Sequence, residues 1–390
     1  MYFDFELMPV QMHMFEAAMV CLAVSLLIFI YKIFPVVRRR KACDESASAA
    51  EASENASVIV YSADECAMLE SLLPVLLTQE YAGQYEVIVV NEGESARVAG
   101  LVQDLRMRYP NLYLTYTPDG ARSLSRKKLA LTLGIKAARH DTVVLTRADA
   151  VIDSRRWLTL MMRNFRGEGH TEVVLGWATA APYDDRGAGA RARSFDYVVD
   201  GVHWIGDALA GHPWRGNEYN LVYRRDLFFR NKGFSRHLNL RQGDDDIFVK
   251  EIATAANTAV ELSAESFVEI PGNNTARAAR ERRASRRFTR RFIRRPRLVF
   301  QTALWCYCLG LILPLVAGAL DYGNAVSWAG AGICLVLWYP IGLLWSPAMK
   351  ALGGRRLFLT LPFLAATRPL RLSLGGLTAR FHRRKRFTWE

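Results

Sequence analysis

The chain has 390 residues, of which 51% are hydrophobic, and it is long enough for one large domain or two ordinary ones with a sizeable core. Its net charge of +13 is local rather than general, because the segment 274–297 holds eleven arginines against a single glutamate and leaves only +3 for the rest, which excludes a uniformly basic protein. The six cysteines form no Cys-x-x-Cys pair and no zinc-like spacing with histidine, which argues against a metal–thiolate site and predicts free thiols in a reducing compartment.

The first predicted element is a membrane span. Phe15 to Val37 is apolar apart from one Glu and one Lys near its ends, and it is long enough to cross a bilayer. The basic run Arg38 to Lys41 follows directly, whereas the residues before the span carry acids. The positive-inside rule therefore places the N-terminus outside and the rest in the cytoplasm. A cleaved signal peptide fits less well, because the apolar run is long and the charge lies on its wrong side.

Residues 1–41 thus form an anchor with a basic flank, and the Ala, Ser and Glu-rich segment 42–56 predicts a flexible tether. Apolar strands and helices then alternate, which predicts a mostly parallel α/β sheet covered on both faces. Ligands of such sheets bind beyond the carboxyl ends of the strands. The expected strands are 57–61, 86–90, 112–117 and 142–146, and the expected helices are 66–79, 97–109 and 125–138.

Charged residues follow three of these strands. Asp64 and Glu65 come after the first, Glu92 after the second, and Arg147 and Asp149 after the fourth. They are either the caps and polar residues of ordinary loops or the lining of one ligand site. A carboxylate there can accept hydrogen bonds from a nucleobase or ribose, or hold Mg²⁺ or Mn²⁺ against a diphosphate. The chain has no glycine-rich dinucleotide or P-loop fingerprint, which argues against a dehydrogenase or an ATPase.

Three adjacent carboxylates, Asp244–Asp246, form the most informative motif. They repel one another, so they cannot all be buried and ionised without partners. The apolar run Ile247 to Val249 follows at once, so the acids border a packed element, and a helix N-terminus there would favour their charge. The alternatives are an acidic helix cap on a solvated loop and a functional acidic site.

The C-terminal part predicts two more spans, Leu298 to Leu320 and Ala325 to Leu344, joined by a short polar turn. Basic residues flank both on the side expected to be cytoplasmic, so 291–350 is a basic belt with two transmembrane helices. The region 351–390 is expected to hold an interfacial apolar segment, 357–366, and a basic tail, 380–386, on the cytoplasmic surface. The arginine run fits either nucleic acid or anionic lipids; the adjacent spans favour membrane lipids and no nucleic acid.

Several motifs, taken in order, resemble those of family 2 glycosyltransferases, particularly membrane-bound bacterial members. The resemblance covers roughly 57–290, as one GT-A domain. The motifs that carry it are Val58–Glu65, Val87–Ser95, Lys127–Ala138 with Val143–Trp157, Gly216–Arg225 with Lys232–Phe234, and Gly243–Asp246.

The resemblance implies a GT-A fold, with one N-terminal and two C-terminal transmembrane helices, and inverting transfer from a nucleotide sugar. It implies that Asp245, between Asp244 and Asp246, deprotonates the acceptor hydroxyl and that Asp149 binds Mg²⁺ or Mn²⁺. Glu92 would contact the base, as uracil of a UDP-sugar. The other implied donor residues are Asp64, Glu65, Lys128, Arg147, Ala148, Arg282 and Arg283, and the acceptor-side residues are Asn217 and Asn220.

The chain departs from the family pattern at three places. Arg147 stands where the family has the first Asp of its Asp-any-Asp motif, and Glu92 stands where an Asp usually ends the second strand. The Gln-any-any-Arg-Trp motif has no clean copy, although Arg280 to Arg283 lies where it is expected.

The prediction is a multi-pass glycosyltransferase of the bacterial inner membrane, with its catalytic domain in the cytoplasm. It would act on a lipid-linked or cell-surface glycan acceptor in polysaccharide biosynthesis. The first alternative is a catalytically degenerate partner subunit of a polysaccharide-assembly complex, which Arg147 favours and Asp149 opposes. A membrane-tethered nucleic-acid binder is a further alternative, which the membrane spans beside the arginine run disfavour. A processive synthase is another, but the two spans after the catalytic region leave little material for a channel.

Overall fold

The computed structural model describes residues 7–118, 124–165, 170–180, 187–272, 275–293 and 298–379. The predicted basic tail 380–386 lies outside them, as do Arg294, Arg295 and Arg297. The chain divides into two compact units, which are described separately below. The helical unit comprises Met1–Val37, Arg186–Gly206 and Arg295–His382, and the sheet unit comprises Arg38–Asp185, Asp207–Arg294 and Arg383–Glu390.

The sheet unit contains a seven-stranded sheet in the order β3-β2-β1-β4-β7-β5-β8 and a two-stranded sheet of β6 and β9. Strand β1 pairs in parallel with β2 and β4, and β2 pairs in parallel with β3, whereas β7 runs antiparallel to β4 and β5. The predicted mostly parallel α/β sheet is therefore confirmed. The strands are β1 Ala56–Ser62, β2 Tyr85–Asn91, β3 Leu112–Tyr116, β4 Thr142–Arg147, β5 Val173–Leu175, β6 Ala178–Ala180, β7 Leu221–Arg224, β8 Thr258–Val260 and β9 Val268–Ile270.

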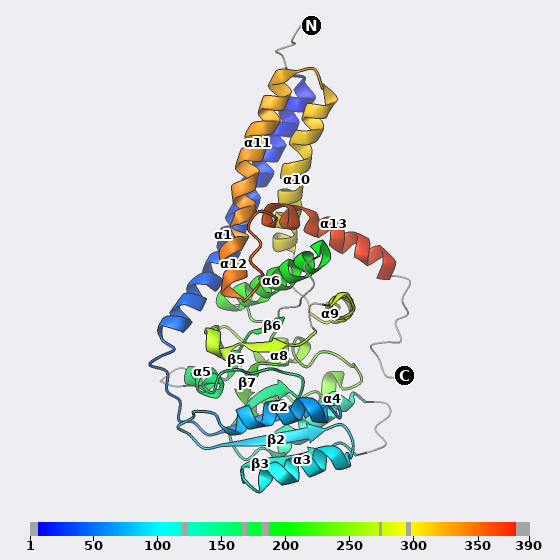
Figure 1. Cartoon of the computed structure of the whole chain (residues 1–390). Coiled ribbons are helices and arrows are strands. Elements are labelled where there is room, and N and C mark those ends of the chain that lie inside the picture. The colour runs from blue at the N-terminus through cyan, green and yellow to red at the C-terminus, as the bar shows by residue number, and fades with distance from the viewer. Residues whose placement is uncertain are drawn as a thin grey trace. The chain divides into compact units, whose positions relative to one another are not determined.

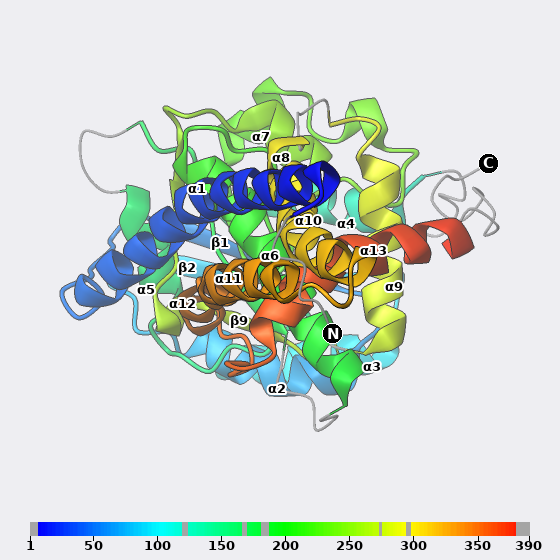
Figure 2. The same cartoon turned by 90° about the horizontal axis from the view of Figure 1, so that it is seen from above.

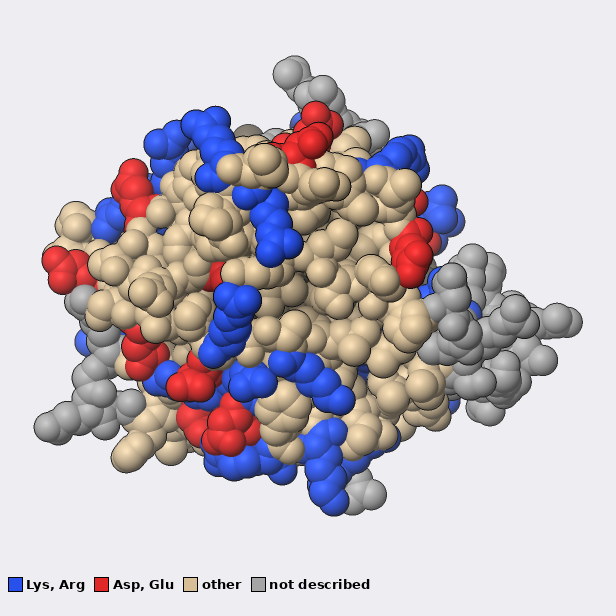
Figure 3. All heavy atoms as spheres, turned by 90° about the horizontal axis from the view of Figure 1, so that it is seen from below, with Lys and Arg blue, Asp and Glu red and all other residues tan. Residues whose placement is uncertain are grey.

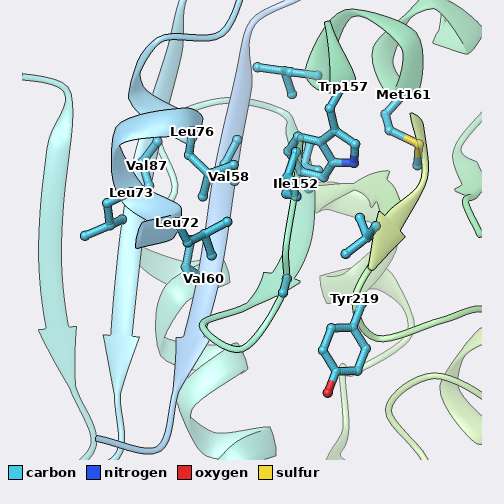
Figure 4. Packing of buried hydrophobic residues seen from close by; sticks show 14 of the residues in the cluster. Val58, Val60, Leu72, Leu73, Leu76, Val87, Ile152, Trp157, Met161 and Tyr219 are labelled. Carbon is cyan, nitrogen blue, oxygen red and sulfur yellow. The ribbon is translucent and has the colours of Figure 1, made fainter. Parts of the chain in front are cut away.

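Helices cover both faces of the parallel part. Leucines of α2 pack on Val58 and Val60 of β1 (Figure 4). Because successive side chains of a strand point to opposite faces, Ile59 faces the other way, and there α4 approaches so closely that a Cβ added at Gly134 would lie 2.8 Å from Ile59 Cγ2. The helices of the sheet unit are α2 Cys66–Leu77, α3 Ala96–Arg106, α4 Arg126–Ala137, α5 Trp157–Met162, α7 Arg225–Arg230, α8 Ile247–Ile252 and α9 Ala276–Thr289, with 3-10 turns η1 Arg163–Phe165, η2 Ser235–His237 and η3 Ala264–Ser266.

The register aligns the carboxyl ends of the parallel strands. Ser62 of β1 lies opposite Asn91 of β2, and Tyr61 lies opposite Arg147 of β4. Asn91 in turn lies opposite Tyr116 of β3. The loops that follow β1, β2 and β4 therefore begin at one edge of the sheet, as the sequence predicts for a ligand site.

The helical unit is built from the apolar part of α1 Pro9–Glu45, most of α6 Ala188–Leu209, and α10 Leu298–Leu320, α11 Ala325–Leu343, α12 Trp345–Ala351 and α13 Leu361–Ala379. Helices α1, α10 and α11 run side by side (Figures 1 and 2). Gln11 Nε2 donates to Ala317 O at 3.0 Å and joins α1 to α10. Tyr307 and Trp338 stack at 5.2 Å and join α10 to α11.

Among the residues that the structure describes, three helices are long and apolar enough to cross a membrane: Pro9–Glu45, Leu298–Leu320 and Ala325–Ala351. Their outward-facing side chains are apolar as well, because Leu27 of α1 is 69% exposed and Val336 of α11 is 72% exposed. Exposing large apolar side chains to water raises the free energy of the protein, so such an outer surface fits a lipid environment. The predicted number and placement of spans is confirmed by these helices.

Helix α6 joins the helical unit through charge as well as apolar packing, which the sequence did not predict. Arg368 of α13 contacts Asp200 at 2.7 Å and Asp196 at 3.3 Å, and Arg371 contacts Asp196 at 2.9 Å. Arg368 is buried, so these contacts supply the partners that a buried guanidinium needs. The four residues are called the helical-unit ion cluster below.

The segment 42–56 differs from the flexible tether that its composition predicts. Its first residues continue α1 to Glu45, and Ala52 is buried. Arg156 Nη2 donates to Ala47 O at 2.6 Å, and Arg224 pairs with Glu54 at 2.8 Å. These polar partners lie far away in the sequence, so composition alone does not reveal them.

Acidic and basic side chains lie next to one another at several places on the face seen from below, and most of that face is formed by other residues (Figure 3). This mixture agrees with the small net charge outside the arginine run.

Candidate functional site

The end of β4 carries an arginine–aspartate pair. Arg147 Nε lies 2.8 Å from Asp149 Oδ1 and Nη2 lies 3.2 Å from Oδ2, so the guanidinium grips both carboxylate oxygens. The Tyr219 hydroxyl also donates to Asp149 Oδ2 at 2.9 Å, pointing away from the core cluster to which its ring belongs (Figure 4). Arg147, which stands in place of the first Asp of the Asp-any-Asp motif, is therefore bonded to Asp149, the retained second Asp.

A chain of ion pairs continues from this point to the acidic triplet. Arg147 Nη1 lies 3.3 Å from Glu218 Oε2, and the same oxygen accepts from Lys127 Nζ. Lys127 in turn contacts Asp244 Oδ2 at 2.6 Å. Arg147, Asp149, Glu218, Lys127 and Asp244 are called the charge network below; it joins β4 and α4 to the loop before α8.

A glycine turn presents the acidic triplet. Gly243 has φ +111°, in the region that favours glycine, and an added Cβ would lie 2.7 Å from Ile247 Cδ1. Asp246 is the N-cap of α8 and accepts from Ile247 N at 2.7 Å. Asp245 instead pairs with Arg215 at 3.6 Å, and its carbonyl accepts from Gly216 N at 2.6 Å. The helix-cap interpretation thus holds for Asp246, while the other two acids have different partners.

The surroundings separate the acidities of Asp244 and Asp245. Burial alone would raise the pKa of Asp244, but the charges of Lys127 and Lys128 lower it. Burial raises the pKa of Asp245 to about 6, and the neighbouring charges of Asp246 and Asp244 add to this while Arg215 opposes it. Adjacent carboxylates with divergent pKa values are typical of acid–base sites, and a value near 6 suits proton abstraction near neutral pH.

Lys128 is buried and holds the loop before the triplet. Its ammonium donates to His237 O at 2.7 Å, Gln242 O at 2.8 Å and His237 Nδ1 at 2.8 Å, which uses all three N–H groups. Burial lowers the Lys128 pKa to about 8, and burial with the Lys128 charge lowers the His237 pKa to about 4. The histidine is therefore neutral at pH 7, and the role of Lys128 in donor binding stays a prediction.

The acids after β1 and β2 lie close to the pair at β4. Burial and the charge of Asp149 raise the pKa of Glu65. Tyr61 donates to Glu92, so this residue also belongs to the same edge. Asp64, with φ 64°, is held by a bond from its N–H to Asn91 Oδ1 at 3.1 Å and faces solvent. The structure thus brings Glu65, Glu92 and Asp149 together.

The two predicted acceptor-side residues lie in different surroundings. Asn217 is half-buried and caps a turn, accepting from Tyr219 N at 3.1 Å. Asn220 is buried; it accepts from Trp157 Nε1 at 3.2 Å and donates to Trp177 O at 3.0 Å and Ser266 O at 2.7 Å. Its amide therefore connects three separate segments, and its role toward an acceptor stays a prediction.

The remaining predicted donor residues are Ala148, Arg282 and Arg283. Ala148 is buried and its N–H donates to Tyr61 O at 2.8 Å, which fixes the start of the β4 loop. Arg282 and Arg283 lie on α9, where Arg283 Nε donates to Ala279 O at 3.1 Å. Their predicted contact with the donor stays a prediction.

The oxygen atoms of Asp149 are not available as ligands of a divalent cation. Both carboxylate oxygens accept from Arg147, and one accepts from Tyr219 as well. Within the described residues, no group of three or more His, Cys, Asp or Glu side chains is arranged to hold a metal ion. A unit charge at about 4 Å interacts by on the order of 4 kcal/mol at an effective dielectric constant near 20, so the guanidinium would also repel a dication strongly.

Sequence reasoning missed Glu218, Arg215 and the ring of Tyr219 as parts of this site. Glu218 and Tyr219 lie within the quoted segment Gly216–Arg225, but their charge and ring carry no motif of their own. Lys127 appeared as one of several basic residues at a helix start. The ion pair between Lys127 and Asp244 is visible only in the three-dimensional structure, because the two residues lie far apart in the sequence.

The chain was compared with known proteins. A sequence model described as Glycosyl transferase family 21 matches residues 20–374. No curated protein matches.

Solved structures are similar at low identity. The mannosyltransferase PcManGT from Pyrobaculum calidifontis, in complex with GDP-Man and Mn²⁺, is 18% identical with a TM-score of 0.46, over 90% of this chain and 99% of that chain. TarS 1–349 from S. aureus is 14% identical with a TM-score of 0.41, over 84% and 93%. Glucosyl-3-phosphoglycerate synthase from Mycobacterium tuberculosis, in complex with Mn²⁺, UDP-Glc and phosphoglyceric acid, is 12% identical with a TM-score of 0.34, over 57% and 74%.

Proposed function

Because the chain belongs to glycosyl transferase family 21, and is therefore a glycosyltransferase that uses a nucleotide-sugar donor, we propose that it transfers the sugar with inversion to a lipid-linked or cell-surface glycan acceptor at the inner face of the bacterial cytoplasmic membrane. The donor is a nucleoside-diphosphate sugar, and UDP-sugars are the first candidates. The acidic triplet beside the charge network is the observation that carries the proposal, and Asp245 is its base.

The chemistry follows from the position and acidity of Asp245. Its carboxylate takes the proton of the acceptor hydroxyl as the acceptor oxygen attacks the anomeric carbon of the donor. The bond from that carbon to the diphosphate oxygen breaks, and its electron pair leaves with the diphosphate. Attack opposite the leaving group inverts the anomeric configuration, and the proton ends on Asp245.

The other acids of the triplet orient this base. Asp246 is committed to the N-terminus of α8, and Asp244 is committed to Lys127. Asp245 is partly exposed, whereas Asp244 and Asp246 are buried, so Asp245 is the carboxylate that an acceptor reaches.

The membrane part of the proposal rests on the helical unit. Three of its helices are long enough to span a bilayer, and their outer side chains are apolar. The basic run after the first span supports a cytoplasmic sheet unit. The sequence predicts Mg²⁺ or Mn²⁺ at Asp149, but the side chains around Asp149 do not fit a divalent ion, so no step of the proposed mechanism passes through a metal.

The test is transfer by the purified protein in detergent, across a panel of UDP- and GDP-sugars with and without divalent cations, using membrane lipids as acceptors. We expect turnover of one donor by the wild type and by Asp104→Asn, the same change at an exposed position of α3, and a rate lower by about 10²-fold or more for Asp245→Asn. Nucleotide binding without turnover, unchanged by Asp245→Asn, would instead favour the degenerate partner subunit. A product with retained anomeric configuration would refute the inverting mechanism.

A further inference from the structure

We propose that Arg147, assisted by Lys127, is the resident cation of the donor site and neutralises the diphosphate in place of a divalent metal ion. The inference rests on the proposed function, since it names how that donor is held. It starts from the sequence: an arginine instead of an aspartate at this position changes the formal charge by +2, which equals the charge of one divalent cation.

The backbone places Arg147 where the donor is expected. It is the last residue of β4, in register with Tyr61 at the end of β1, and the bond from Ala148 N to Tyr61 O closes the turn behind it. Glu65 and Glu92, predicted to contact the nucleotide, follow β1 and β2 at the same edge, where Tyr61 also donates to Glu92. Diphosphates in such sheets bind beyond the carboxyl ends of the strands.

The surroundings are built to hold a permanent positive charge. The guanidinium lies 5.6 Å from the ring centre of Tyr61 and 4.9 Å from that of Tyr219, while Asp149 binds it at two points. Burial lowers the pKa of Arg147, but Tyr219 and Asp149 outweigh this and raise it. Ring faces and a bidentate carboxylate together stabilise a partly buried guanidinium without cancelling its ability to bind a second anion.

Arg147 has N–H groups that remain to bind a phosphate. Asp149 and Glu218 use three of the five N–H groups of Arg147, which leaves one on Nη1 and one on Nη2. The Glu218 contact is single and long at 3.3 Å, and Glu218 keeps Lys127 as a second partner. A phosphate oxygen can therefore take the place of Glu218 on Arg147 without leaving a carboxylate unpaired. As the sugar departs, negative charge grows on the diphosphate beside two fixed cations.

The count of charges supports this assignment. Lys128, whose pKa is about 8 and whose ammonium is charged at neutral pH, lies behind Asp244. With it, three cations, Arg147, Lys127 and Lys128, face the three carboxylates of the charge network, so these six groups are formally neutral among themselves before the donor enters. With an aspartate at position 147 the same six groups would carry −2, the charge that one dication balances.

The experiment measures nucleotide binding, separately from turnover. UDP and GDP are titrated into the full-length protein in detergent by calorimetry, first with EDTA and then with Mn²⁺, and Mn²⁺ binding to the protein alone is followed by electron paramagnetic resonance. We expect one nucleotide to bind in EDTA, with an affinity that Mn²⁺ changes by less than about threefold, since charge-assisted bonds already supply the contact. We expect no Mn²⁺ site in the wild type.

Two variants sharpen the test. Arg147→Met should weaken nucleotide binding in EDTA by about tenfold or more, while Arg108→Met, on the exposed surface, should not. Arg147→Asp should bind nucleotide only with Mn²⁺ and should lower the resonance signal of free Mn²⁺, which the wild type should leave unchanged. Thermal unfolding checks that each variant is folded, and the wild-type result in EDTA depends on no variant.

The outcomes separate the two proposals. Wild-type binding that requires Mn²⁺ or Mg²⁺, or binding in EDTA that Arg147→Met leaves unchanged, would overturn this inference and leave the proposed function standing. Failure of both nucleotides to bind under every condition would overturn the proposed function and the inference with it.

Discussion

Each unit contains an aspartate between two cationic side chains, and the pKa values of these two aspartates shift in opposite directions. In the helical unit, burial raises the pKa of Asp196 although Arg368 and Arg371 lie at 3.3 and 2.9 Å. In the sheet unit, burial would raise the pKa of Asp244, but Lys127 at 2.6 Å and Lys128 lower it.

The difference shows what decides whether a buried acid stays charged. Asp196 shares Arg368 with Asp200, and the like charge of Asp200 also raises the pKa of Asp196. Asp244 has two lysines, one in direct contact, so the attraction exceeds the cost of burial. The helical-unit ion cluster therefore holds two helices together, whereas the charge network maintains an ionised carboxylate beside Asp245. The variants below perturb the two clusters separately.

The largest effect is expected on catalysis, in the sheet unit. Asp245→Asn removes the base but keeps its size, and loss of a general base costs about 10²–10⁴-fold in rate. With the Asp245 pKa near 6, kcat/KM of the wild type should rise as the pH increases through about 6 and then level off. The pH profile of transfer measures this. A profile flat from pH 5 to 8 would assign the base to another group.

The next largest effect is expected in the helical unit. Arg368→Met leaves Asp200 without its 2.7 Å partner and weakens the hold on Asp196. Breaking a buried ion pair on one side typically costs about 3–5 kcal/mol. Thermal unfolding in detergent should show this loss, with nucleotide affinity of the folded fraction unchanged. Adding Asp196→Asn and Asp200→Asn should restore part of the stability, and a triple variant no better than Arg368→Met would contradict the ion-cluster interpretation.

A smaller effect links stability to pH in the sheet unit. The raised pKa of Asp245 means that the folded state binds its proton more tightly than the unfolded chain, so the ionised group destabilises the fold above pH 6. A shift of about 2 pKa units corresponds to about 3 kcal/mol. Asp245→Asn should therefore be more stable than the wild type at pH 7, and the advantage should vanish as the pH falls to 4. Unfolding at pH 7, 5 and 4 measures it.

Protonation of His237 changes the free energy of unfolding in the opposite direction over the same pH range. The His237 pKa of about 4 lies below the ordinary 6.5. The stability that the neutral imidazole contributes is therefore fully present above pH 6.5 and is lost as the pH falls to 4. In the wild type the gain from Asp245 offsets part of that loss. The Asp245→Asn variant should consequently lose stability more steeply in acid than the wild type. Parallel curves would argue against the raised pKa of Asp245, and no loss of stability by Asp245→Asn between pH 6.5 and 4 would argue against the buried neutral histidine.

The smallest effect is expected for an exposed ion pair. Arg277 and Glu281 contact at 3.1 Å on α9, and both side chains are more than half exposed. Exposed pairs of this spacing contribute about 0.3–0.5 kcal/mol. Arg277→Gln should hence leave the unfolding midpoint nearly unchanged, in contrast to Arg368→Met. A loss comparable to that of Arg368→Met would mean that α9 has a role beyond its own helix.

The regular elements were the easiest part to predict. Strands such as Val58–Tyr61 and spans such as Leu298–Leu320 have continuous apolar runs of the right length, and both are found as predicted. The strands β5 to β9 were missed because each has only three or four residues, too short for a period to show. The attachment of α6 to α13 was missed because it depends on ion pairs more than 160 residues apart in sequence.

The candidate site divides in the same way. The strand-end acids Glu65, Glu92 and Asp149 were predicted to converge, and the register of the sheet brings them together. Which cation each acid would meet was not predictable, because Lys127 comes from α4 and Glu218 from the segment before β7, and packing sets how the two approach each other. Arg147 was visible in the sequence as a departure, but its bidentate grip on Asp149 was not.

Asn220 has a consequence for the way the family can vary. Its amide lies so close to Gly176 that a Cβ there would come within 2.4 Å of Asn220 Cγ. We therefore expect the two positions to vary together. A relative that carries a larger side chain at the position of Gly176 should also lack the asparagine, and with it the bonds to Trp157, Trp177 and Ser266. This pair should covary across an alignment of relatives.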